Sequence, residues 1–355
     1  MEKVKSLKKD WVIGLHHNRH DYHFSYNPLF DFSMAGEEDL IEKDGKDIPL
    51  VTMDACNFVP ECFKSSPSGE KFWDILYIAR AVRFKKIPEF FQCIRKLYNS
   101  GKKYRVLFIC PVPPYKRSER RTVFYDIRKV YDGMFNEEEK NLFTLLTINY
   151  RHPFPFDLDT LSHFYKSSKI FVHFASDERR CRVASYAWKS GLPVVGMSCV
   201  GSLLPKELRI KPYFYEVNDY EDFNTLIPEA ITESQKMKEL PENKAQTFFD
   251  LEDSKKRLGE ELNKIFVKNG LKFENKELFD KNLDIRLGRH VNIGSGPNSV
   301  PINFERFLEV LSSPQLREMI PCETVDPETK IAESFKEKQK DGLLNKIISF
   351  IKIKK

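Results

Sequence analysis

The sequence contains no long apolar run and no dense cysteine framework. A membrane-spanning helix needs about twenty consecutive apolar residues, and no window of the chain approaches that composition. The seven cysteines are scattered and form no C-x-x-C pair, which is typical of reduced thiols in a cytosolic protein. The N-terminal residues 1–5 lack the apolar segment of a signal peptide. We therefore expect a cytoplasmic protein without a membrane span.

Charge of one sign is not in strong excess either. The 355 residues include 58 Lys and Arg against 52 Asp and Glu, which gives a net charge of +6. This mild excess permits contact with nucleotides, phosphates or anionic lipids but does not require nucleic acid. The chain has no RNA- or DNA-binding motif and no internal repeat, so nucleic acid is not an expected partner. The composition is that of a globular protein long enough for two domains.

The centre of the chain alternates short apolar runs with helical patterns. The helical periodicity is clearest over 88–100 and 158–168. Alternation of this kind predicts an α/β fold, in which a Rossmann-like parallel sheet carries helices on both faces. The runs typical of buried strands are 75–78, 106–110, 143–148, 170–173 and 194–197.

The most informative segment is 161–195. Its pattern predicts a helix, a buried strand, a charged loop, a second helix, and a Gly-containing turn into another strand. The charged loop, 176–180, falls where the carboxyl end of a strand meets the start of a helix. Ligands bind at such junctions in open α/β sheets, and a helix N-terminus attracts anions through its unpaired N–H groups and dipole. The segment therefore predicts a site for an anion such as a diphosphate.

The order of residues in this segment resembles the donor-binding half of retaining GT-B glycosyltransferases of the family 4 or group 1 type. That family has the pattern P-S-x-x-E-G-F-G followed by E-A-x-A-x-G-x-P-V-V. Glu178 takes the first Glu position, and Tyr186 stands where the family has its second Glu. Arg179 and Arg180 replace the small residues that follow the first Glu. The residues that match the end of the pattern are Ala187, Gly191, Pro193, Val194 and Val195.

A second match lies about a hundred residues upstream, after the predicted strand that begins near Trp73. The family places an Arg just after this strand and a Lys shortly beyond it, and both contact the donor diphosphate. Arg80 and Lys85 have that spacing. Two fixed cations neutralise the charge that builds on a leaving nucleoside diphosphate, and they can do so without a metal.

The resemblance implies an enzyme that transfers a sugar from a nucleotide-diphosphate donor, with retention of configuration, to a glycan or a lipid-linked acceptor. It implies no cofactor and no metal. In this interpretation Arg80 and Lys85 hold the diphosphate, and Glu178 acts as the catalytic residue that orients the sugar. No protein nucleophile is evident in the sequence.

Four residues near Glu178 have alternative interpretations. Arg179 and Arg180 either contact phosphate or block the site. Tyr186 either contacts the nucleotide, as the family's second Glu does, or is a core aromatic residue. His173 lies in a predicted buried strand, where a hydrogen-bonded core histidine is the favoured expectation.

The predicted domains are a partial N-terminal segment with a linker at 1–70, the donor domain at 71–231, and a helical extension at 232–355. Residues 29–35 are expected to form the last strand of a shortened acceptor-side region, and 254–268 an amphipathic helix. Because an acceptor domain would be truncated, a second hypothesis remains. The chain could be a non-catalytic nucleotide-sugar-binding module, or one subunit of a split glycosyltransferase whose partner chain supplies the acceptor half.

Two further segments carry unusual composition. His16, His17, His20 and His23 lie close together in the sequence. A helix would place His16 and His20 on one face with a spacing suited to a metal, although a polar loop at the cleft is the favoured alternative. Residues 343–355 form a basic amphipathic pattern, which could contact an anionic inner-membrane surface peripherally or pack as a terminal helix on protein.

Overall fold

The computed structural model describes residues 12–16, 24–25, 30–34, 41–42, 49–65, 70–110, 117–147, 158–240 and 242–270. All of them belong to one compact unit that spans residues 12–273. The basic pattern at 343–355 lies outside the described residues, as do His17, His20 and His23. In the part of the chain that is described, no helix combines the length and apolar character needed to cross a bilayer.

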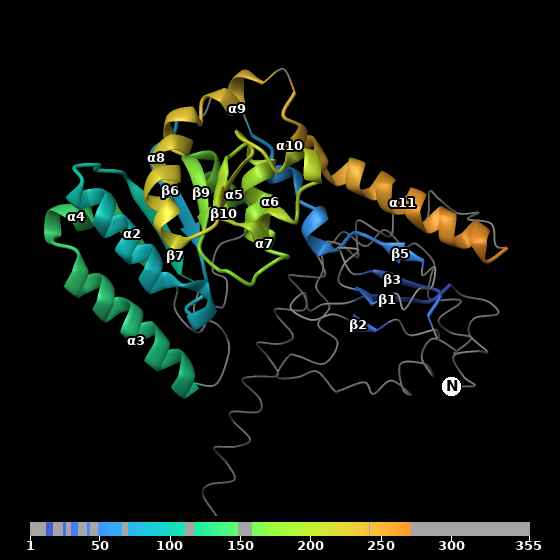
Figure 1. Ribbon diagram of the computed structural model, residues 1–355, viewed down its shortest axis with the longest axis horizontal. Coiled ribbons are helices and arrows are strands. Elements are labelled where there is room, and N and C mark those ends of the chain that lie inside the picture. Colours follow the sequence, from blue (N-terminus) through green and yellow to red (C-terminus); the bar gives the residue numbers. More distant parts are fainter. Residues whose placement is uncertain are drawn as a thin grey trace, which may run out of the picture. The chain divides into compact units, whose positions relative to one another are not determined.

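The central element is a six-stranded parallel sheet, which confirms the predicted Rossmann-like α/β fold (Figure 1). Its strand order is β11-β10-β9-β6-β7-β8. The five predicted strands are present with similar bounds. The edge strand β11 was not predicted from the sequence, because its short FYEV segment includes the exposed Glu216. The strands are β6 (Trp73–Ile78), β7 (Val106–Cys110), β8 (Phe143–Thr147), β9 (Ser168–His173), β10 (Val194–Met197) and β11 (Phe214–Val217).

The strand order reverses between β6 and β9. From β6 the chain builds outward through β7 to β8, and it then returns to the other side of β6 to form β9, β10 and β11. β6 and β9 pair in parallel, with Ile75 opposite Ile170 and Leu76 opposite Phe171. In open α/β sheets the crevice outside the carboxyl ends of the strands at such a reversal is the usual ligand site. The strand order alone therefore predicts a ligand site at the carboxyl ends of β6 and β9.

The sheet is covered by helices on both faces. Successive residues of a strand point to opposite faces, so Tyr77 packs in one buried cluster and Leu76 in the other. α2 (Ile87–Asn99), α3 (Arg117–Met134) and α8 (Phe223–Glu233) contribute to the cluster with Tyr77. The opposite face carries α5 (Leu158–Lys166), α6 (Arg182–Lys189) and α10 (Lys244–Phe248) (Figure 1). The remaining helices are α4 (Glu137–Leu142), α7 (Ser198–Gly201), α9 (Lys236–Glu239) and α11 (Leu251–Lys268).

A small parallel sheet precedes the large one. It joins β1 (Gly14–His16), β3 (Phe32–Met34) and β5 (Leu50–Val51) in the order β1-β3-β5. β3 falls within the strand expected at 29–35. His16 ends β1, which does not fit the less favoured alternative of a helix face shared with His20. A separate pair consists of β2 (Phe24–Ser25) and β4 (Ile41–Glu42).

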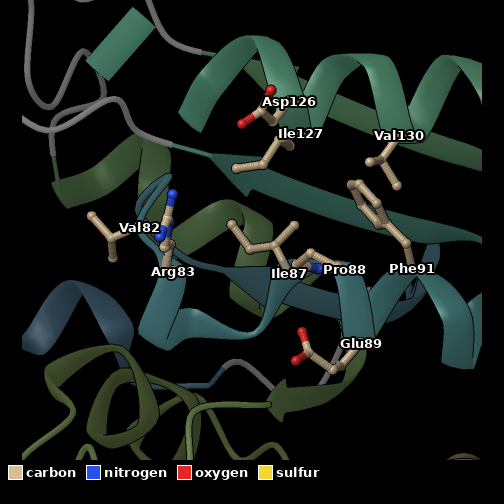
Figure 2. A pocket seen from close by; sticks show the side chains of 9 residues that line it. All are labelled: Val82, Arg83, Ile87, Pro88, Glu89, Phe91, Asp126, Ile127 and Val130. Carbon is tan, nitrogen blue, oxygen red and sulfur yellow. The ribbon is translucent and has the colours of Figure 1, made fainter. Parts of the chain in front are cut away.

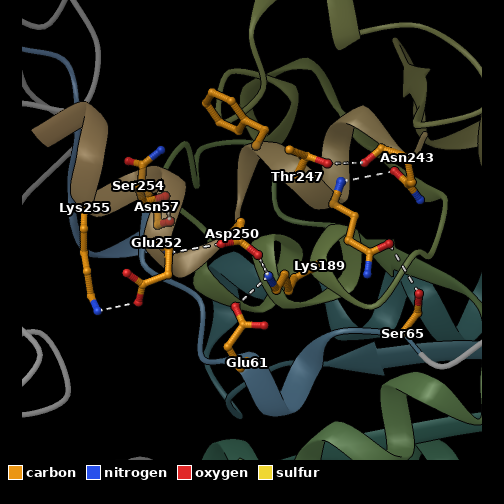
Figure 3. Close-up of polar contacts among 12 residues, drawn as sticks. Asn57, Glu61, Ser65, Lys189, Asn243, Thr247, Asp250, Glu252, Ser254 and Lys255 are labelled. Atoms are coloured by element: carbon orange, nitrogen blue, oxygen red, sulfur yellow. Dashed lines mark hydrogen bonds and ion pairs between the residues drawn. The ribbon is translucent and has the colours of Figure 1, made fainter.

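A buried lysine joins the segment before the large sheet to the helices after it (Figure 3). Lys189 of α6 is fully buried, and its Nζ lies 2.9 Å from Glu61 Oε1 and 2.7 Å from Asp250 Oδ2. Asp250 caps the start of α11, and Ser254 in the first turn of that helix donates a hydrogen bond to the Asn57 carbonyl at 2.6 Å. The helix expected at 254–268 is therefore present and begins at Leu251. Its N-terminal end is bound to Lys189 of α6 and to Asn57 of the segment before the large sheet.

Replacement of Lys189 by Met should lower the free energy of unfolding by about 1.5–3 kcal/mol, because two charged hydrogen bonds to a buried ammonium are lost while the aliphatic stem is kept. Urea denaturation measures this change. The matched control is Lys264→Met on α11, where the ion pair with Glu261 has an exposed ammonium. That control should leave the free energy of unfolding almost unchanged, because solvent screens an exposed ion pair. Equal losses in the two variants would contradict the structural role of Lys189.

Candidate functional site

Two loops meet at the carboxyl ends of the central strands. One follows β6 and contains Arg80 and the 3-10 turn η4 (Arg83–Lys85). The other follows β9 and connects it to α6 through residues 174–181. Because β6 and β9 are neighbours, these loops lie together at the point where the strand order reverses. The structure thus brings the two sequence matches to one place.

Lys85 and Glu178 form an ion pair across the two loops, and His173 shares it. Glu178 Oε2 accepts hydrogen bonds from Lys85 Nζ and from His173 Nε2, the latter at 2.8 Å. His173 and Lys85 are 1% and 4% exposed. The backbone of Lys85 is fixed as well, because its carbonyl accepts a hydrogen bond from the buried Tyr77 hydroxyl. Glu178 therefore accepts hydrogen bonds from two buried donors.

These contacts determine the charge of Glu178. Burial disfavours its carboxylate, but the hydrogen bond from His173 and the positive charge of Lys85 outweigh burial and hold the pKa of Glu178 below its usual range. Burial lowers the pKa of His173, against the opposing effect of Glu178. Near neutral pH the pair is therefore an ionised carboxylate and an uncharged imidazole that donates from Nε2.

Each of these two residues keeps one polar atom without a partner among the described residues. The Nδ1 of His173 is buried and makes no hydrogen bond there. Glu178 uses Oε2 for both of its contacts, and no contact of Oε1 is found in the described part of the chain. The Glu178 side chain is 23% exposed. A carboxylate with one oxygen anchored and partial exposure can accept a hydrogen bond from a bound hydroxyl group.

His173, Glu178 and Cys181 also place their potential metal-ligating atoms within 4.8 Å of one another. Burial raises the pKa of the Cys181 thiol well above its ordinary value, so the thiolate that binds metals is disfavoured. The ammonium of Lys85 already occupies the Oε2 atom of Glu178. A lysine thus supplies a positive charge at this position, and the expectation that no metal is needed stays a prediction.

Arg80 and Arg179 lie on the same two loops. Arg80 is exposed and is the second residue after β6, and Arg179 is partly buried beside Glu178. α6 begins two residues beyond Arg180, and its N-cap residue Cys181 provides no side-chain cap. The phosphate-binding roles expected for Arg80 and Arg179 stay predictions.

Arg180 has a different environment. Its guanidinium is buried, with Nε 2.7 Å from Asp54 Oδ2 and Nη2 3.1 Å from Asn57 Oδ1. Asp54 and Asn57 are the capping residues of the 3-10 turn η2 (Ala55–Asn57), which lies in the segment before the large sheet. The phosphate contact expected for Arg180 is untested, but this side chain already links the Glu178 loop to that turn. The contacts of Arg180 with Asp54 and Asn57 are therefore structural.

Tyr186 is a core residue in this structure. It is 8% exposed, and its ring stacks on Phe63 with the centroids 4.1 Å apart. Its ring also meets Tyr165 edge-on at 6.2 Å. This packing corresponds to the core-aromatic alternative for Tyr186, and the ribose contact stays untested.

His173 was expected to be a hydrogen-bonded core residue, and the structure adds a contact that the sequence did not reveal. It is buried in β9 as expected, yet its hydrogen-bond partner is Glu178. One signal was available: His173 is the last residue of its strand and lies five positions before Glu178. The carboxyl end of a central parallel strand is where functional side chains gather.

A separate pocket of about 260 Å³ lies between α2 and α3 (Figure 2). Three charged side chains, Arg83, Glu89 and Asp126, are part of its lining. Arg83 belongs to the same turn as Lys85 but lines this pocket instead of the Glu178 pair. The apolar lining consists of Val82, Ile87, Pro88, Phe91, Ile127 and Val130.

No family model and no curated protein matches this sequence. Structural neighbours are glycosyltransferases of the GT-B fold. The pneumococcal O-GlcNAc transferase GtfA, in complex with UDP and GlcNAc, covers 67% of this chain at 12% identity, with a TM-score of 0.44. This chain spans only 46% of that protein. Anabaena HepE, in complex with UDP and glucose, covers 74% of this chain, which covers 74% of it, at 12% identity and a TM-score of 0.49. Sucrose-phosphate synthase from Thermosynechococcus elongatus covers 62% of this chain, which covers 53% of it, at 16% identity and a TM-score of 0.41. At these values the neighbours assign no substrate to this chain.

Replacement of Asp54 by Ala should lower the free energy of unfolding by about 3–5 kcal/mol, because it leaves the buried Arg180 guanidinium without its counter-charge. Urea denaturation followed by circular dichroism checks this. The control is Glu221→Ala, which removes the exposed ion pair with Lys96 and should cost no more than about 1 kcal/mol. A cost for Asp54→Ala as small as that of the control would show that Arg180 is not held by this pair.

The stability contributed by Glu178 should depend on pH. Its pKa is lowered in the folded protein, so its ionised form stabilises the fold above the unfolded-state pKa of about 4.3, and that stabilisation is lost as the pH falls toward the folded pKa. Wild type should therefore exceed Glu178→Gln in free energy of unfolding at pH 7, and the difference should shrink below about pH 4.3. Urea denaturation of both proteins across this range measures it. A difference that grows as the pH falls would contradict the ionised assignment.

Proposed function

We propose that this chain binds a nucleotide-diphosphate sugar at the carboxyl ends of β6 and β9 and transfers the sugar to a glycan or lipid-linked acceptor. The observation that carries the proposal is the anchored carboxylate of Glu178. It lies at the reversal of the strand order, it is held by Lys85 and His173, and it is ionised and partly exposed. A sugar rich in hydroxyl groups is a suitable partner for such a carboxylate, because each hydroxyl can donate a hydrogen bond.

The diphosphate would be held by cations and by the start of α6. Arg80 is exposed beside the site, and guanidinium matches the geometry of phosphate oxygens. An ammonium has three N–H donors, so Lys85 can hold Glu178 with one and a phosphate oxygen with another. α6 adds unpaired N–H groups and a positive dipole end. These groups would stabilise the charge on the leaving nucleoside diphosphate, and in this proposal no metal is required.

Transfer would proceed with retention at the anomeric carbon. Glu178 would orient the donor sugar through its hydroxyl groups, and Arg80 and Lys85 would take up the charge released as the glycosidic bond breaks. The proton of the acceptor hydroxyl would pass to the departing phosphate, so the protein need not provide a nucleophile. The acceptor class, a partner chain that supplies an acceptor half, and peripheral membrane contact through 343–355 all stay predictions.

A second candidate is a nucleotide-sugar-binding module without catalysis. The observation that favours it is the packing of Tyr186, which fills the position of the family's second Glu with a ring stacked on Phe63. A phenol buried in the core supplies no carboxylate to a ribose. Donor turnover separates the two candidates, because the module would bind a nucleotide sugar without releasing free nucleotide from it.

Thermal unfolding in the presence of UDP, GDP, ADP and their sugar conjugates tests the donor site. At a hundredfold excess over Kd, a ligand specific for the folded state stabilises it by about 2.7 kcal/mol. We expect one base to give a clear shift in Tm, and Arg80→Ala to abolish it. The matched control is Arg83→Ala, three residues away in the same loop, which lines the α2–α3 pocket and should keep the shift.

Two results would contradict the enzyme proposal in different ways. If no nucleotide or conjugate shifts the Tm of wild type, the donor site itself is wrong. If a conjugate binds but releases no nucleotide with any glycan or lipid-linked acceptor tested, the binding-module candidate replaces the enzyme. Loss of the Tm shift in both Arg80→Ala and Arg83→Ala would contradict a nucleotide site at the ion pair of Glu178 and Lys85.

A further inference from the structure

We propose that His173 is a positioning residue that fixes the carboxylate plane of Glu178 so that its second oxygen faces the donor sugar. This inference rests on the proposed function, and it adds a residue that the two sequence matches do not include. The geometric basis is the single hydrogen bond from Nε2 to Glu178 Oε2 at 2.8 Å. His173 contacts no ligand in this scheme and acts only through Glu178.

The backbone around His173 holds its side chain closely. His173 is the last residue of β9 and pairs with Gly196 of β10. A Cβ atom on Gly196 would lie 3.3 Å from the His173 Cβ and 3.2 Å from its carbonyl oxygen. Absence of that atom lets the two strands approach at this point. Together with its 1% exposure, this packing gives His173 a defined position. A defined position is needed if His173 is to orient Glu178.

Lys85 alone does not determine the orientation of the carboxylate. An ammonium at the end of a flexible four-carbon stem attracts a carboxylate without a strong directional preference. Glu178 could then rotate about its last side-chain bond while Lys85 followed it. An imidazole N–H points in one direction in the plane of the ring. Since His173 and Lys85 bond to the same oxygen, they leave the other oxygen turned away from both.

The hydrogen bonding of His173 also argues against a purely structural role. A neutral ring that donates from Nε2 has an acceptor at Nδ1, and that buried atom has no partner among the described residues. An unpaired buried acceptor loses its hydrogen bonds to water without replacement, so an apolar side chain would favour stability more. The lowered pKa of His173, caused by burial, keeps the ring uncharged. The ring can therefore orient Glu178 without adding a second positive charge beside Lys85.

The experiment compares His173→Phe, which keeps a ring but has no donor, with His173→Gln, whose amide N–H can replace Nε2–H. Calorimetry gives Kd for UDP and UDP-glucose, and for the matching GDP and ADP pairs. We expect all three proteins to bind the bare nucleotide within about twofold. The Phe variant should lose about tenfold to hundredfold in affinity for the conjugate, which corresponds to about 1.4–2.8 kcal/mol. The Gln variant should recover most of that loss.

Circular dichroism and urea denaturation establish that the variants are folded, and His173→Leu replaces the Phe variant if the larger ring is not accommodated. Equal weakening of nucleotide and conjugate binding would overturn the positioning role, because a structural defect affects both. Failure of Gln to improve on Phe would overturn it as well. If wild type binds none of the pairs, the proposed function fails first, and this inference fails with it.

Discussion

The parallel pairing of β6 with β9 is the constraint on which the candidate site depends. It brings Lys85 and Glu178 together although 93 residues separate them in the sequence. Each residue is only a charged side chain on a loop after a strand, and neither would be fixed in isolation. Once the strands pair, their loops leave the sheet at the same edge, and the ammonium and carboxylate meet there under partial exclusion of water. Burial raises the pKa of Glu178, but the hydrogen bond from His173 and the attraction of Lys85, which is stronger there than in bulk water, outweigh it and keep Glu178 ionised.

The same loop is held from a second direction. Glu178 is anchored on the side of the sheet, whereas Arg180, two residues on, reaches Asp54 and Asn57 in the turn that precedes the sheet. A loop between a strand and a helix is usually the most mobile part of an α/β unit. Here its acidic residue and its second arginine are each bound to a different part of the fold, which restricts the positions that a ligand would encounter. Preorganised charge of this kind favours binding, because little reorganisation is needed when the ligand arrives.

Much of the large sheet could be predicted from the sequence, because buried parallel strands are continuous apolar runs such as Val106–Cys110. Arg80, Lys85 and Glu178 could be assigned to one edge of the sheet, since each lies in a loop that follows a predicted strand. Side-chain partners could not be predicted. Asp54 lies 126 residues from Arg180, and only the tertiary structure brings the two together. Likewise, the face of α6 that carries Tyr186 became a core surface because Phe63 packs against it. The edge strand β11 was missed because FYEV lacks a long apolar run.

The segment 49–65 has a consequence for how this chain could be recombined with relatives. It supplies an acid to Arg180, a carboxylate to Lys189 and an aromatic ring to Tyr186, so it functions as part of the large-sheet unit although it precedes that sheet in the sequence. In a chimera joined between this segment and β6, a segment from a relative would face Arg180, Lys189 and Tyr186. Those three side chains would then lack the partners that they have in this chain. A junction placed before Leu50 would keep these contacts. The boundary of the unit that can be exchanged is therefore set by its contacts and not by the first strand of the large sheet.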